Sequence, residues 1–179
     1  MAEIWSEAEG CLKKAHELND NDFEVHRLMA EVNLSGRNFR VAERHATKAY
    51  KMVPNDPRVL SVYGEVSLRI GKIDQGLDAL KLALEIDPIA QGKTNSDSRT
   101  SPVLFGEYLA RNKDNCLQLV EKLEDIDTKS WLLTAKLCSD EEHDITEEDW
   151  YKRGKKEFKD KDWAAEVDLS LIHISEPTR

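Results

Sequence analysis

The sequence has little of what a turn-rich β fold needs, since 8 of its 179 residues are glycine and 5 are proline. These two residues supply most tight turns, so their scarcity disfavours sandwiches and barrels. Cysteine is sparse as well. The three cysteines, Cys11, Cys116 and Cys138, are odd in number and include no CxxC pair, which predicts reduced, buried thiols instead of a disulfide framework.

Long apolar runs and basic charge are also lacking. No apolar run approaches the roughly 20 residues that span a bilayer, and the first residues do not place an apolar core after a basic segment, as a secretory signal does. The sequence therefore predicts a cytoplasmic protein without a membrane partner. The 26 Lys and Arg against 35 Asp and Glu give a net charge of -9, which argues against nucleic-acid binding.

Motifs of catalysis and cofactor binding are missing. The sequence contains no HExxH, no Walker loop, no GxGxxG and no GxSxG. Its five histidines include no pair four residues apart, so the spacing predicts no metal site. His26 and His45 are expected to pack or cap on helices, and His16 to lie near a helix end. We expect neither an enzyme nor a cofactor.

The sequence does contain an internal repeat of 34 residues that needs no gap. Eight residues recur when the sequence is shifted by this period: Asn21, Asp22, Val25, Glu31, Val32, Leu34, Ala49 and Pro54 match Asn55, Asp56, Val59, Glu65, Val66, Leu68, Ala83 and Pro88. A period of this length with helical patterning is typical of a two-helix repeat.

The second unit indicates how one repeat folds. Asp56 is expected to cap a helix, and Pro57 fits the first turn, where a missing N–H costs nothing. Gly71 supplies a turn, an apolar helical stripe resumes at Ile73, and Pro88 ends the second helix. Each unit is therefore predicted to be a pair of helices joined by a short turn.

These residues resemble the tetratricopeptide-repeat (TPR) family, which favours a small residue at its eighth position, alanine at its twentieth and twenty-seventh, and proline near its end. The residues that comply are Ala30, Gly64, Ala42, Ala49, Ala83, Pro54 and Pro88; Gly76 replaces one alanine, and His26 and Leu60 replace an aromatic residue. The resemblance implies an all-α fold, an antiparallel helix-pair solenoid forming a TPR-like superhelix, regular to about residue 90 and divergent after it.

The predicted organisation is a half repeat over residues 1–20, repeats over 23–56 and 57–90, a loop insertion over 91–101 and divergent TPR-like helices over 102–168. The half repeat is either a natural cap or a sign of missing upstream sequence. Residues 169–179 break the helical pattern and resemble the translation of a transposase adapter from sequencing libraries, so we interpret them as a non-native tail.

The family resemblance also implies a function, namely a non-catalytic scaffold for protein–protein interaction. The first helix of each unit would line a concave groove that binds a partner segment. The implied groove residues are Glu24, Arg27, Glu31, Leu34, Arg58, Ser61, Glu65, Leu68 and Arg69. The structural alternative is an ordinary solvated face.

The charged groove residues indicate which charge the partner segment should carry. Glu31 and Glu65 stand where family members that grip acidic chaperone tails favour a neutral donor, so we expect no binding of such tails and a partner segment of mixed or basic charge instead. A second hypothesis is a regulatory TPR arm of a larger bacterial signalling enzyme, such as a class III nucleotide cyclase. It rests on the likeness of residues 55–88 to repeats that follow the catalytic domain of such enzymes.

Overall fold

The computed structural model describes residues 2–87, 100–122, 128–139, 151–152 and 156. Within these residues the regular structure is helical and includes no strand, as the all-α prediction requires. The chain divides into two compact units, Met1–Gly92 and Lys93–Arg179. Among the described helices, none combines the length and apolar character that a bilayer crossing requires.

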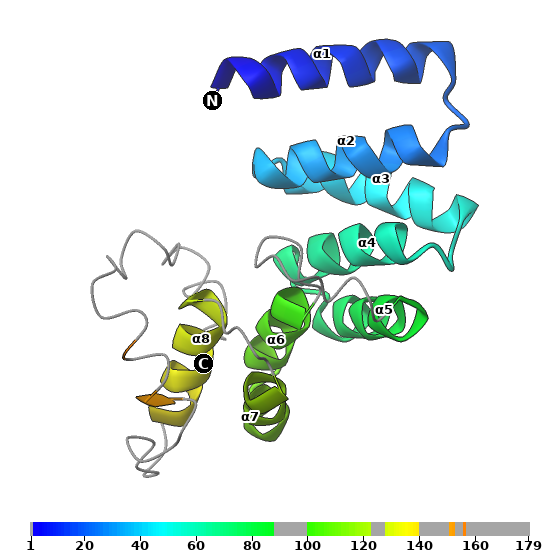
Figure 1. Cartoon of the computed structure of the whole chain (residues 1–179). Coiled ribbons are helices and arrows are strands. Elements are labelled where there is room, and N and C mark those ends of the chain that lie inside the picture. The colour runs from blue at the N-terminus through cyan, green and yellow to red at the C-terminus, as the bar shows by residue number, and fades with distance from the viewer. Residues whose placement is uncertain (1, 88–99, 123–127, 140–150, 153–155, 157–179) are drawn as a thin grey trace. The chain divides into compact units, whose positions relative to one another are not determined.

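The first unit is a stack of five helices: α1 (Ala2–Leu18), α2 (Phe23–Ser35), α3 (Phe39–Met52), α4 (Pro57–Arg69) and α5 (Ile73–Ile86). Each helix packs against the next one in the chain, and α2 also packs against α4 (Figure 1). The α2–α3 and α4–α5 hairpins are the two helix pairs that the 34-residue period predicts.

The two hairpins begin and turn in the same way. The Asp22 and Asp56 carboxylates cap α2 and α4, each accepting a backbone N–H two residues on at 2.9 Å. Such a cap satisfies an N–H that the helix leaves unpaired. The turn inside each hairpin contains a residue with positive φ, namely Arg37 (59°) and its equivalent Gly71 (82°). The predicted cap at Asp56 is confirmed.

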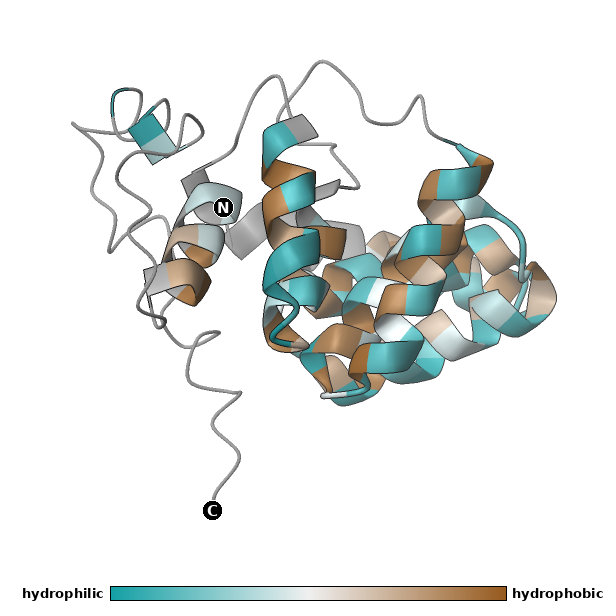
Figure 2. Cartoon of the chain, turned by 90° about the horizontal axis from the view of Figure 1, so that it is seen from below, coloured by the Kyte–Doolittle hydropathy of each residue, from teal (hydrophilic) through white to brown (hydrophobic). Residues whose placement is uncertain are grey.

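The core of the first unit combines alanine with larger aliphatic residues between the helices. One cluster contains Ala30, Ala42, Ala46, Val62 and Val66, and a second contains Leu60, Ala79 and Ala83. Each helix carries hydrophobic and hydrophilic residues along its length (Figure 2). Helix stability in this unit therefore depends on burying one face of each helix.

Gly64 and Gly76 mark a close approach between α4 and α5. A Cβ added at Gly64 would lie 2.9 Å from the carbonyl oxygen of Gly76, and a Cβ added at Gly76 would lie 2.9 Å from that of Gly64. The equivalent residues of the α2–α3 hairpin are Ala30 and Ala42. Glycine therefore allows the second hairpin to pack backbone against backbone.

The second unit contains α6 (Thr100–Leu109), α7 (Lys113–Lys122) and α8 (Thr128–Ser139), which pack against one another. Val103, Leu104, Val120 and Leu133 are buried in it. Because α6 begins at Thr100, the last two residues of the predicted loop insertion are helical. The predicted tail, residues 169–179, lies outside the described residues.

Candidate functional site

The predicted groove residues lie on α2 and α4, which are equivalent helices of successive repeats. The guanidinium Nη1 of Arg58 lies 3.5 Å from the carboxylate oxygen Oε1 of Glu24, and these residues are 34 positions apart. Helices α2 and α4, which are one repeat period apart in the sequence, therefore lie side by side. We call the surface formed by Glu24, Arg27, Glu31, Leu34, Arg58, Ser61, Glu65 and Arg69 the α2–α4 face.

Charged side chains on this face hold one another in place. The Arg27 Nε and Nη2 groups donate to Glu24 at 2.9 and 2.7 Å, and its Nη1 donates to Glu31. Arg58 donates through Nη2 to Asp56 at 2.9 Å. Arg27 is held by Glu24 and Glu31, and Arg58 by Asp56 and Glu24. These contacts restrict the long side chains before a ligand binds, which lowers the entropy lost on binding.

The protonation of the face follows from these contacts. The Glu24 hydrogen bond raises the pKa of Arg27, and Arg27 in turn lowers the pKa of Glu24. Burial raises the pKa of Glu31, although the charge on Arg27 opposes that effect. Burial lowers the pKa of Arg69, and the charge on Glu65 opposes it. A guanidinium stays charged despite such a shift.

One predicted groove residue is buried. Leu68 is 2% exposed, and its side chain occupies the space where a Cβ on Gly76 would lie. Leu34, its equivalent in the first repeat, is half-buried and packs against the cluster that contains Ala42. Leu68 therefore belongs to the α4–α5 core and is removed from the predicted groove.

A basic surface on α3 was missed by the sequence analysis. A hollow of about 370 Å³ is lined by residues of this one helix: Arg40, Glu43, Arg44, Thr47, Lys48 and Lys51. Its four cations are spaced by four, four and three residues, a helical pattern that could have identified it. Lys48 pairs with Asp20 at 2.6 Å, which neutralises part of the positive charge, whereas Glu43, the carboxylate among the lining residues, pairs with Lys72 at 2.8 Å.

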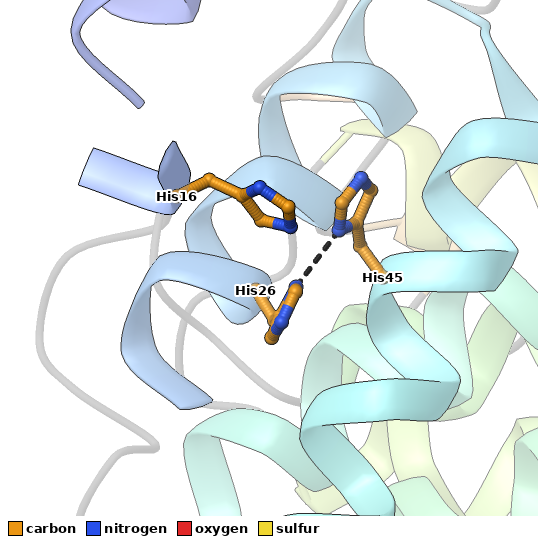
Figure 3. A group of neighbouring side chains, drawn as sticks. All are labelled: His16, His26 and His45. Atoms are coloured by element: carbon orange, nitrogen blue, oxygen red, sulfur yellow. Dashed lines mark hydrogen bonds between the residues drawn. The ribbon is translucent and has the colours of Figure 1, made fainter. Parts of the chain in front are cut away.

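Three histidines from three helices converge beside this surface. His16 of α1, His26 of α2 and His45 of α3 turn their rings toward one another (Figure 3). Their ring centroids are separated by 5.1 Å (16 to 26), 5.7 Å (16 to 45) and 5.1 Å (26 to 45). One ring nitrogen of each lies within 4.8 Å of the others. We call these residues the histidine cluster.

Hydrogen bonds and burial fix the state of the two inner rings. Burial lowers the pKa of His26, and it lowers the pKa of His45 to about 4, so both are neutral at pH 7. His26 Nε2 lies 3.0 Å from the Asp20 carbonyl oxygen, an acceptor only, and therefore carries the proton. His26 Nδ1 is then bare and accepts from His45 Nδ1 at 2.9 Å.

This assignment leaves a lone pair without a donor. Because His45 carries its proton on Nδ1, its Nε2 is an acceptor, and that atom is buried with no hydrogen-bond partner among the described residues. His16 is more open, at 33% exposure, and its Nε2 lies 2.8 Å from the Asp20 carboxylate. The histidine cluster thus combines imidazole nitrogens, a nearby carboxylate and one unsatisfied buried acceptor.

The comparisons with known proteins identify the fold. No protein-family model matches the chain, and no curated protein sequence matches it. A solved structure reported under "Functional Characterization of Pseudomonas Aeruginosa pilF" matches with a TM-score of 0.67 and 19% identity, covering 97% of this chain and 85% of that one. At this identity the likeness concerns the fold alone. The chain has an all-helical, TPR-like repeat fold.

Proposed function

We propose that the chain is a non-catalytic scaffold that binds a segment of a partner protein along the α2–α4 face. The helical-repeat fold supports this role because stacked helix pairs present a long, continuous surface. The observation that carries the proposal is the ion-pair network of Arg27, Arg58, Glu24 and Glu31, which joins two successive repeats into one surface. Its charges are ordered before binding, as a recognition surface needs.

The charge on this face suggests the composition of the partner. Three carboxylates, on Glu24, Glu31 and Glu65, stand against three guanidinium groups, on Arg27, Arg58 and Arg69. A face with balanced charge attracts neither a uniformly acidic nor a uniformly basic ligand. A partner segment of mixed charge can place its cations against the carboxylates and its acids against Arg58, the most open of the paired guanidiniums at 51% exposure.

Acidic chaperone tails do not fit this surface. A terminal carboxylate needs donors, whereas Glu31 and Glu65 offer acceptors and would repel it at short range. Titration with an acidic C-terminal chaperone peptide should give no specific binding. Micromolar binding that disappears when the terminal carboxylate is amidated would contradict this part of the proposal.

Site-specific photo-crosslinking tests the face itself. A photoreactive residue at Ser35, exposed in the last turn of α2, should crosslink a discrete partner in extract from the native cells. A matched probe at Asp78, exposed on α5, should not. The crosslink should weaken as salt rises and disappear in a Glu31→Lys and Glu65→Lys double variant. Equal crosslinking from both positions, or a crosslink unaffected by charge reversal, would refute the proposal.

A further inference from the structure

The repeat shows that the histidine cluster is an exception within its own fold. When the sequence is shifted by one period of 34 residues, His16, His26 and His45 correspond to Tyr50, Leu60 and Ala79. In the next layer of the stack, Leu60 and Ala79 belong to one hydrophobic cluster, and Tyr50 packs against it. The positions one repeat period further along the chain therefore form a hydrophobic contact in place of the three imidazole rings.

This replacement is costly for a purely structural contact. Burying a polar group without a full set of hydrogen bonds destabilises a fold. His26 and His45 are 1% and 4% exposed, and the Nε2 atom of His45 has no partner among the described residues. The apolar residues of the next layer show that the same position in the fold does not require imidazole.

We propose that His16, His26 and His45 form a binding site for a divalent transition-metal ion of the class that prefers imidazole, with Zn²⁺ as its representative. Such ions bind neutral imidazole nitrogen, and three histidines are a known zinc ligand set. The site would join α1, α2 and α3, fastening the first helix of the stack to the hairpin that follows it.

The distances are close to those that a metal needs. With Zn–N bonds of 2.0–2.1 Å and tetrahedral angles, ligand nitrogens lie about 3.3 Å apart. The Nδ1 atoms of His26 and His45 are 2.9 Å apart, and the full set spans at most 4.8 Å. His16 has the freedom to close that gap because it is the least buried of the three. Small ring rotations would therefore complete the set.

The surroundings supply what a ligating histidine needs. Metal-bound histidines donate their second N–H to a carbonyl or carboxylate, which fixes the ring. His26 already makes this contact, since Nε2 donates to the Asp20 carbonyl oxygen and leaves Nδ1 bare. For His45 the proton would move from Nδ1 to Nε2 on metal binding, which leaves Nδ1 free to bind, or the bare Nε2 would bind instead.

The carboxylate of Asp20 lies beside the cluster, where its negative charge would balance a bound cation. Its Oδ1 atom lies 2.8 Å from His16 Nε2 and 3.6 Å from His26 Nε2. It also accepts from Lys48 at 2.6 Å, so Lys48 competes with a metal for this carboxylate. A water molecule could take the fourth position if that ion pair persists.

Zinc titration of the tag-free, full-length chain tests the site. Chain freed of metal by chelator dialysis should bind one Zn²⁺ in competition with a chromophoric chelator, and Co²⁺ should give the visible spectrum of a four-coordinate nitrogen-ligated ion. His16→Gln should weaken zinc binding about tenfold or more. This variant changes the most accessible ligand, so it should disturb the fold least of the three single replacements.

The neighbouring repeat provides a matched control. The triple variant His16→Tyr, His26→Leu and His45→Ala copies the residues of the next layer, so it should keep its helical circular dichroism and lose the zinc site. His143→Gln and Cys11→Ser should bind zinc like the natural chain. If no chain binds one Zn²⁺, if the folded triple variant binds as tightly, or if Cys11→Ser abolishes binding, the proposal is wrong. Should the triple variant not fold, an unchanged affinity and Co²⁺ spectrum in His16→Gln would equally overturn it.

Discussion

Replacing Gly64 with alanine sets helix propensity against helix packing. In a helix interior alanine is favoured over glycine by about 0.5–1 kcal/mol. At Gly64, however, the new Cβ would lie 2.6 Å from Cγ of Leu80 and 2.9 Å from the carbonyl oxygen of Gly76. Neither atom is the end of a flexible side chain, so α4 and α5 must separate.

The cost of overpacking should exceed the gain in helix propensity. Overpacking a tight contact costs about 1–3 kcal/mol, so Gly64→Ala should destabilise the first unit by about 1 kcal/mol after the propensity gain is subtracted. For a cooperative unit of roughly this size, that loss lowers the melting temperature by about 4–8 °C. Thermal unfolding of the full chain, followed by circular dichroism at helical wavelengths, measures it.

Gly10 provides the matched control. It is exposed in the middle of α1, and a Cβ there would meet nothing within 4 Å. Gly10→Ala should therefore gain the propensity term alone and stabilise α1 by up to about 1 kcal/mol. If Gly64→Ala is as stable as the natural chain while Gly10→Ala behaves as expected, α4 and α5 separate at little cost, and the packing argument fails.

Three further outcomes are expected. Ala83→Trp, at a residue with 0% exposure, should lower the melting temperature clearly, and an unchanged transition would mean that the repeat register is wrong. Asp56→Ala should cost about 1 kcal/mol at pH 7 through the lost helix cap. The Arg58 hydrogen bond lowers the pKa of Asp56 in the folded chain. The stability that ionised Asp56 contributes is therefore present above the usual carboxyl pKa of about 3.9 and is lost as pH falls through the lower pKa of the folded state. The unfolding curves of the natural chain and of Asp56→Ala should converge in that acidic range. Burial of the cysteines was predicted correctly for Cys116 and Cys138 and wrongly for Cys11, which is exposed on α1. Burial raises the pKa of Cys116 to about 12, so a thiol reagent should modify one cysteine in the native chain and three after denaturation.

Local sequence determined the helices of the first unit. Asp56 and Pro57 specify where α4 begins, because capping and a fixed φ act within a few residues. The 34-residue period specifies that hairpins repeat, because equivalent residues must bury equivalent faces. Both kinds of information are readable along the chain, so the helix-pair fold could be predicted without knowing any distant contact.

Contacts between helices decided which residues are available to a ligand. Leu34 and Leu68 are equivalent residues of the two repeats. Leu68 is buried and fills the space beside Gly76, whereas Leu34 is half-buried against the cluster that contains Ala42. The equivalent positions 42 and 76 differ by one methyl group, alanine against glycine, and the burial of the two leucines differs as well. The family resemblance alone could not make this distinction.

The histidine cluster could be predicted from the sequence even less than the burial of Leu68. His16, His26 and His45 are separated by 10 and 19 residues and belong to three helices, so no spacing rule for a single helix or turn unites them. The sequence determined the repeat positions that they occupy. Only the stacking of α1 on α2 and α3 brings one ring nitrogen of each within 4.8 Å of the others, because metal-binding geometry depends on distance in space and helix packing sets that distance.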